Sequence, residues 1–202
     1  TELSKPRAPI ADLDALPFPA WDLIDYNKFW TRGSMASAGI RPYFTMFTSR
    51  GCPYRCVYCH QIFGKNFRAR SPESVAEETA RLVKMGAGDI EILDDIANFK
   101  QDRFDRMLEL MLERGLHPKL SFPNAIRADL MQEHSIDLLK RVGVGEVSVA
   151  VETASERLQA LLGKNLSLAR VSRTIDMLAD RRIFTRGFFM LGFPTETEAE
   201  MR

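Results

Sequence analysis

The chain of 202 residues alternates between short β-rich segments and longer segments with helical periodicity, and this alternation constrains its fold more than any other feature. β-branched, aromatic and apolar residues concentrate in five short runs, which we predict to be strands: 42–49, 89–95, 118–124, 145–152 and 185–193. Helical crossovers between consecutive strands give a parallel sheet with right-handed connections. The sequence therefore predicts an α/β fold with about five parallel strands. The sheet is either doubly wound or curled into a barrel.

Capping residues and glycines set the expected limits of the helices. The first helix has Ser71 as its N-cap, Pro72 at its first helical position and Gly86 at its end. Apolar residues at helical spacing predict a second helix that ends before Gly115. The other predicted helical ranges are 129–142, 155–181 with an interruption near Gly163, and an opening turn within 194–202.

The first 41 residues differ from the rest of the chain, because they are rich in proline and aromatic residues and show no clear periodicity. We interpret residues 1–41 as an extended linker or arm that packs on the outside of the sheet, since their large apolar side chains argue against full solvation. A frayed linker is the alternative. The predicted division is thus an arm over 1–41 and an α/β core over 42–202.

The charge balance argues against several classes of partner. The chain carries 28 basic and 27 acidic side chains, a formal net charge of +1, so no overall field favours nucleic acid or an anionic membrane. The sequence shows no apolar run of about 18 residues and no signal-peptide pattern. We therefore expect a cytoplasmic protein that binds neither nucleic acid nor a membrane.

Polar and turn-forming residues follow every predicted strand. In parallel α/β folds ligands bind at the carboxyl ends of the strands. In chain order these ends carry Cys52, Cys56 and Cys59; Asp94 and Asp95; Asn124 and Arg127; Glu152 and Thr153; and Gly192, Pro194 and Glu196. We predict a binding site along this rim. For the paired aspartates a helix cap remains an alternative, and for Arg127 a surface ion pair.

The three cysteines lie within the stretch 52–59. Thiolates on one short loop can surround one object, and soft thiolates select zinc, copper(I) or iron–sulfur clusters. Structural zinc needs a fourth ligand, and His60 is poorly placed because adjacent side chains of an extended segment point to opposite sides. An iron–sulfur cube accepts three thiolates on three irons and leaves its fourth iron open. A disulfide framework is not expected, since three cysteines cannot all pair.

The stretch GCPYRCVYC resembles the cluster loop of the radical S-adenosylmethionine (SAM) superfamily, which reads cysteine, three residues, cysteine, any residue, aromatic, cysteine. Tyr58 fills the aromatic position. The resemblance implies a 4Fe–4S cluster held by Cys52, Cys56 and Cys59, with S-adenosylmethionine on the open iron. It further implies reductive cleavage of the sulfonium to a 5'-deoxyadenosyl radical, which abstracts hydrogen from a small-molecule substrate.

The same family places cofactor contacts at other positions of this sequence. Tyr58 would lie beside the adenine. Asp94 and Asp95 stand at the second-strand motif near the methionine amino group, where the family usually has two glycines and a glutamate. Arg127 is a candidate partner for the cofactor carboxylate, because a guanidinium fork suits a carboxylate.

Two later motifs complete the expected cofactor site. Glu152 in VAVETASERL resembles the fourth-strand residue that binds the ribose hydroxyls. The stretch FFMLGFPTET resembles the fifth-strand motif that lines the adenine pocket, with Gly192 and Pro194 fixing its turn.

A narrower resemblance covers nearly the whole chain. LPFPAWDLIDYNKFW, ILDD, IRADL, VETASERL and GFPTET occur in the order found in radical enzymes with an upstream cobalamin-binding domain. That group includes methyltransferases acting on unactivated carbon and the anaerobic cyclase of bacteriochlorophyll synthesis. No Asp-x-His-x-x-Gly motif occurs, so any cobalamin would be held by a domain outside this chain. The resemblance also implies an electron donor such as flavodoxin or ferredoxin.

The family barrel has six strands, so we expect a partial (β/α)6 barrel, truncated before its last strand. The implied activity is methylation or cyclisation at an unactivated carbon. Two alternatives remain open. One is a methylthiotransferase, which would bring a second cluster and an RNA-binding tail. The other is a non-catalytic binding module stabilised by zinc.

Overall fold

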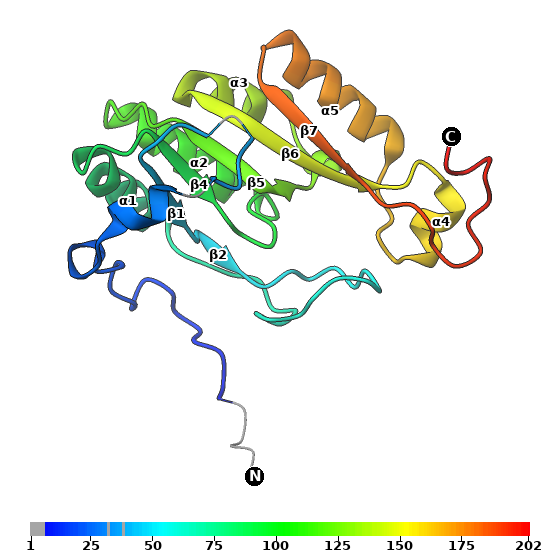
Figure 1. The fold of residues 1–202 in the computed structure, drawn as a ribbon, viewed down its shortest axis with the longest axis horizontal. Helices are drawn as coiled ribbons and strands as arrows, with labels where there is room; N and C mark the ends of the chain where they lie inside the picture. Colours follow the sequence, from blue (N-terminus) through cyan, green and yellow to red (C-terminus); the bar gives the residue numbers. More distant parts are fainter. Residues whose placement is uncertain (1–6, 32, 38) are drawn as a thin grey trace.

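The computed structural model describes residues 7–31, 33–37 and 39–202, which form a sheet with helices packed on one side (Figure 1). The sheet has five strands in the order β1-β4-β5-β6-β7, and all neighbours are parallel. Its strands are β1 (Tyr43–Met46), β4 (Asp89–Ile92), β5 (Leu120–Ile126), β6 (Val144–Glu152) and β7 (Phe184–Phe189). β1 and β7 are the edges, so the sheet is open. The α/β fold with about five parallel strands is confirmed, as a partial barrel.

Four helices cover one face of the sheet: α1 (Pro72–Lys84), α2 (Gln101–Glu113), α3 (Glu133–Val142) and α5 (Leu168–Asp180). The predicted cap of α1 is present, since Ser71 Oγ accepts the Ser74 backbone N–H at 3.1 Å. Ile90 and Phe122 of the sheet pack with Phe104 of α2 in the main core, and all three are fully buried. Burying one such side chain contributes about 1.5–3 kcal/mol, so this helical layer is the main stabilising unit.

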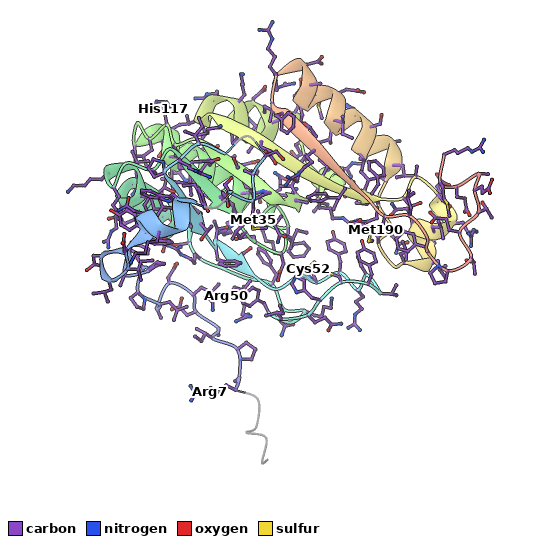
Figure 2. The ribbon with its side chains drawn as sticks, viewed as in Figure 1. Arg7, Met35, Arg50, Cys52, His117 and Met190 are labelled. Carbon is purple, nitrogen blue, oxygen red and sulfur yellow. The ribbon has the colours of Figure 1, made fainter. Side chains whose placement is uncertain are left out.

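The opposite face of the sheet is polar. Because side chains alternate along a strand, every second residue points away from the helical layer. The buried polar residues on this face are Asp89, Glu91, Ser121, Glu146 and Ser148. The arm segment 33–37 lies over them: the Ala36 N–H donates to Glu91 Oε1 at 3.1 Å, and Arg186 of β7 donates to the Met35 carbonyl. Figure 2 shows Met35 in front of the sheet.

The arm also wraps the β1 edge. It contains two short 3-10 helices, η1 (Trp21–Leu23) and η2 (Tyr26–Thr31). Trp21 and Trp30 pack edge-on against Phe44 of β1, with ring centroids 5.1 and 5.8 Å apart. Residues 1–6, 32 and 38 of the predicted arm lie outside the described residues, and the division at residue 41 remains a prediction.

A second, antiparallel sheet was not predicted from the sequence. β2 (Ser49–Arg50) pairs with β3 (Arg68–Ala69), with two residues in each strand. This pair closes the base of the loop 51–67, which carries the three cysteines and is called the cysteine loop below. The run 42–49 looked like one strand, but the chain leaves the main sheet after Met46. Pairs this short carry no periodicity signal, so only the folded chain reveals them.

The later predicted helices match the observed ones in part. The helix expected over 129–142 begins at Glu133, because Met131 is extended (φ −66°, ψ 140°) and separates it from η3 (Ala128–Leu130). The stretch 155–181 is interrupted as expected, into α4 (Glu156–Leu161) and α5.

The predicted helix within 194–202 is wrong, because these residues form turns. Glu200 accepts the Thr197 N–H at 3.0 Å and pairs with Arg157 of α4 at 2.8 Å. The first contact stabilises a turn within the segment, and the second holds the segment against α4. Among the described helices, none is both long and apolar enough to cross a bilayer.

Candidate functional site

The carboxyl ends of the central strands open into a cavity of about 270 Å³. The cysteine loop forms one wall, and Figure 2 shows Cys52 where that loop leaves β2. The predicted site residues that line the cavity are Cys52, Cys56, Tyr58, Cys59, Asp95, Asn124, Arg127 and Glu152. The other predicted residues, Asp94, Thr153, Gly192, Pro194 and Glu196, do not line it. The structure therefore brings most of the predicted site together at the rim expected for a parallel α/β fold.

Backbone contacts order the cysteine loop at its start and within it. The Cys52 N–H donates to the Gly64 carbonyl at 3.3 Å, and the Cys59 N–H donates to the Cys56 carbonyl at 3.2 Å. Cys56 Sγ lies 3.9 Å from the Gly163 carbonyl, which belongs to the connection between α4 and α5. The loop is thus held against a segment more than a hundred positions away in the chain.

The thiols are partly shielded from water. Burial raises the pKa of the Cys52 thiol. Burial, and then the neighbouring Cys56, raise the pKa of Cys59. Because thiolates bind metals and thiols do not, metal binding must displace these protons, so it is coupled to proton release.

The donor set fits a cluster better than a single ion. In the described part of the chain, no three His, Cys, Asp or Glu side chains converge to hold one metal ion. A cubic cluster does not need that convergence, because each thiolate binds a different iron. Three soft sulfur donors on one loop, facing a cavity with room for a further ligand, match such a cluster.

A buried ion pair lies beside the cysteine loop in the cavity wall. Lys164 Nζ lies 3.0 Å from Glu152 Oε1, and both side chains are about 10% exposed. Lys164 also lies 5.8 Å from the Tyr58 ring centroid. Burial, and then the negative charge of Glu152, raise the pKa of Tyr58, so its hydroxyl stays protonated.

The backbone around this pair is strained. Glu152 has φ +70° and Ala125 of β5 has φ +78°, a region that side chains with a Cβ rarely adopt. Both line the cavity, and both lie at register shifts of the sheet. Such strain persists where the surrounding structure fixes the backbone, and it is concentrated at functional sites.

Arg127 spans the cavity wall and stacks on Tyr54. Its guanidinium carbon lies 3.7 Å from the Tyr54 ring centroid. Nε donates to Asp129 at 3.0 Å, and Nη2 donates to the carbonyls of Lys164 and Asn165 at 3.0 and 3.1 Å. These bonds use Nε and Nη2 and do not involve Nη1. Arg127 therefore anchors the 164–165 segment while it faces the cavity.

The two aspartates after β4 have different surroundings. Asp95 lines the cavity, accepts the Gly51 N–H at 3.0 Å and lies 3.7 Å from His60 Nε2. Asp94 is buried, and its oxygens accept hydrogen bonds from the Thr48 N–H and Oγ1, both at 2.6 Å, and from Ser49 Oγ. Asp94 therefore connects the end of β4 to the base of the cysteine loop. Its carboxylate is used by these hydrogen bonds and does not line the cavity.

Gly192 and Pro194 lie in the turn that follows β7. Gly192 has φ +86°, and Glu196 caps the turn by accepting the Phe193 N–H at 3.0 Å. The Phe193 ring comes closest to the cavity, with its centroid 6.4 Å from that of Tyr58. The turn residues thus shape the rim from outside the cavity.

Three polar residues of the cavity were not predicted as site residues: Tyr54, His60 and Lys164. Tyr54 lies inside the cysteine loop, where its spacing carried no separate signal. Lys164 follows Gly163 in a short connection, and only the fold brings it to Glu152, twelve positions away in the sequence.

The fold and site together define an α/β protein with a three-cysteine loop at the carboxyl ends of a parallel sheet. The chain belongs to the Radical SAM superfamily, whose family model matches residues 46–202. Membership implies a 4Fe–4S cluster and S-adenosylmethionine as cofactors.

Curated relatives extend the similarity over almost the whole chain. An uncharacterized methyltransferase of Pyrococcus horikoshii is 30% identical over 97% of this chain and 41% of its own length. An anaerobic magnesium-protoporphyrin IX monomethyl ester cyclase of Rubrivivax gelatinosus is 27% identical over 94% of this chain and 33% of its own length. The chain thus spans between one third and about two fifths of these relatives.

A solved structure supports the fold. The radical S-adenosylmethionine methyltransferase TsrM from Kitasatospora setae, with cobalamin and a 4Fe–4S cluster bound, matches with a TM-score of 0.70. The match covers 77% of this chain and 32% of TsrM at 22% identity. The chain thus shares its fold with a radical S-adenosylmethionine methyltransferase in whose structure cobalamin is bound.

Proposed function

We propose that this chain is the catalytic core of a radical enzyme that methylates or cyclises a small molecule at an unactivated carbon. The observation that carries the proposal is the shared cavity: the three cysteines, the Lys164–Glu152 pair and Arg127 line one cavity of about 270 Å³. When bound, the cluster and S-adenosylmethionine would supply one-electron cleavage of the sulfonium to a 5'-deoxyadenosyl radical.

Each wall of the cavity has a chemical role in this proposal. Cys52, Cys56 and Cys59 hold the cluster through their thiolates. Glu152 accepts hydrogen bonds from the ribose hydroxyls, and Lys164 holds its carboxylate in place. Arg127 directs Nη1 toward the methionine carboxylate, because its other donors are bound to the protein.

Tyr58 and Asp95 complete the proposed cofactor site. Tyr58 packs beside the adenine and contributes an aromatic face. Asp95, fixed by the Gly51 N–H, accepts a hydrogen bond from the methionine amino group. Asp94 is assigned a structural role instead, since its carboxylate is occupied by Thr48 and Ser49.

The loop also offers a surface for an electron donor. Val57 is 71% exposed and Ile62 is 78% exposed, on the segment that carries the cysteines. Exposed apolar side chains this close to a redox centre suit a transient contact with a flavodoxin or ferredoxin. Cobalamin, which is bound in the TsrM structure, would be held here by a domain outside this chain.

The test is anaerobic reconstitution with iron and sulfide, followed by reduction in the presence of S-adenosylmethionine. We expect about four irons and four sulfides per chain, a reduced-cluster EPR signal that changes on adding S-adenosylmethionine, and 5'-deoxyadenosine detected by mass spectrometry. The triple variant Cys52→Ala, Cys56→Ala, Cys59→Ala should lose all three signals while its circular dichroism spectrum stays that of an α/β protein.

The matched control is Gln61→Ala, a change just after the cysteines at an exposed side chain that has no role in the proposal. This variant should keep the cluster and form 5'-deoxyadenosine at the rate of the unaltered chain. One bound zinc with no sulfide would instead identify the zinc-stabilised module and end the radical proposal.

A further inference from the structure

A second cavity lies away from the cysteine loop, between the arm and the polar face of β1 and β4. Its volume is about 370 Å³, within the range of small-molecule sites. Four of the nine residues that line it are aromatic: Trp21, Tyr26, Trp30 and Tyr43. None of the residues lining the cysteine cavity contributes to it, so this cavity is a separate site.

The aromatic wall is held in place before any ligand binds. Tyr26 and Trp30 lie 4.9 Å apart between ring centroids, and Trp30 packs edge-on against the buried Phe44 ring. The Trp30 indole N–H donates to the Tyr43 carbonyl at 2.8 Å. A fixed wall lowers the ordering cost that a ligand would otherwise meet on binding.

One acidic side chain, Glu91 of β4, lines this apolar cavity, and it is fully buried. Its Oε1 accepts the Ala36 N–H at 3.1 Å. Its Oε2 is buried and has no hydrogen-bond partner among the described residues. No Lys, Arg or His occurs among the described residues that line the cavity. A buried carboxylate with one oxygen unsatisfied is costly, and a cation or hydrogen-bond donor bound in the cavity would relieve that cost.

We propose that this cavity binds the ammonium group of a small organic amine, with Glu91 as its counter-ion and Trp21, Tyr26 and Trp30 as aromatic walls. Aromatic faces attract cations, most strongly when water is excluded. A divalent metal ion is a poorer occupant, because it requires about six oxygen ligands and the cavity offers one carboxylate. The proposal is independent of the radical chemistry.

The chain carries its own reporter for this site. Its two tryptophans are Trp21 and Trp30, and both line the cavity. Tryptophan fluorescence of the full 202-residue chain therefore reports binding there. The probes are aminomethylcyclohexane, which is a cation at about pH 7.5 because an alkyl ammonium group has a pKa near that of lysine, and cyclohexylmethanol, a neutral molecule of nearly the same shape.

We expect the amine to change the fluorescence saturably and to bind at least about tenfold more tightly than the alcohol. The variant Glu91→Gln keeps the size of the side chain and removes its charge, so it should abolish this preference. The control Glu198→Gln removes the same charge from a side chain that is 91% exposed, and it should bind like the unaltered chain.

Equal binding of amine and alcohol, or no saturable response to the amine, would overturn the proposal. Unchanged amine binding by a folded Glu91→Gln variant would do so as well. If circular dichroism shows that Glu91→Gln does not fold, the amine and alcohol titrations of the unaltered chain decide the question alone.

Discussion

At the scale of single residues, Asp89 shows how a buried acid links this fold to pH. Asp89 lies on the polar face of β4, is fully buried, and accepts a hydrogen bond from Ser121 Oγ at 2.9 Å. Burial raises the pKa of its carboxyl to about 6, although the Ser121 bond opposes the shift. The folded chain therefore favours the protonated carboxyl over the ionised one.

The sign of the pH effect follows from this shift. Stability contributed by Asp89 is complete at a pH below the ordinary aspartate pKa of about 3.9 and is lost as the pH rises toward 6. The variant Asp89→Asn cannot ionise. Relative to the unaltered chain it should gain about 1–3 kcal/mol in free energy of unfolding between pH 4 and pH 7.

Urea denaturation at a series of pH values measures this gain. The control Asp102→Asn removes an acid from the exposed face of α2, so it accounts for the loss of charge alone. If the stability difference between Asp89→Asn and the unaltered chain is the same at about pH 4 and about pH 7, the assigned role of Asp89 is refuted.

At the scale of elements, the cysteine loop depends on a glycine at its entrance. Gly51 has φ +86°, and a Cβ at this position would lie 2.4 Å from the Asn66 carbonyl oxygen. Gly64 has a similar φ of +76°, but a Cβ there would meet nothing within 4 Å. Alanine would therefore introduce backbone strain at both positions, but it would clash with a neighbour only at Gly51.

Alanine substitutions can separate these two effects. Gly64→Ala should cost about 1–2 kcal/mol, because it introduces only the strain of a positive φ. Gly51→Ala should cost more and also displace the loop, so it should bind less iron after reconstitution. Denaturant melts and iron content of the two variants test this. Equal losses in both measurements would show that the contact with Asn66 is unimportant.

The elements differ in how far the sequence predicts them. The five strands and the cap of α1 were predicted because apolar runs and Ser71-Pro72 are local signals. The cysteine loop was also predicted from the sequence, because its three cysteines lie close together within 52–59. The β2–β3 pair, the Lys164–Glu152 contact and the burial of Asp94 were not, because each depends on segments that meet only in the folded chain.

At the scale of the whole molecule, the β7 edge is the most exposed part of the sheet. Within the described residues β7 pairs only with β6. Phe184 is 52% exposed and Phe189 is 61% exposed, so apolar side chains flank unpaired backbone groups. Such an edge favours pairing with a second chain.

The 202-residue chain should therefore self-associate as its concentration rises. Phe189→Lys should weaken this association about tenfold or more, since a lysine on an edge strand disfavours pairing. Sedimentation velocity at several concentrations measures the effect. Leu23→Lys, on an arm residue that is 79% exposed, is the control and should associate like the unaltered chain. Identical behaviour of the two variants would exclude the β7 edge as the contact.

Arg186 has a consequence for how the molecule comes apart. Its guanidinium donates to the Met35 carbonyl and Ser37 Oγ of the arm, to the Pro123 carbonyl of β5 and to Ser148 Oγ of β6. From its position on β7, this one side chain connects the N-terminal arm to strands β5 and β6. Detaching the arm would remove two of these four partners, so we expect the arm and β7 to detach from the sheet in a single cooperative step.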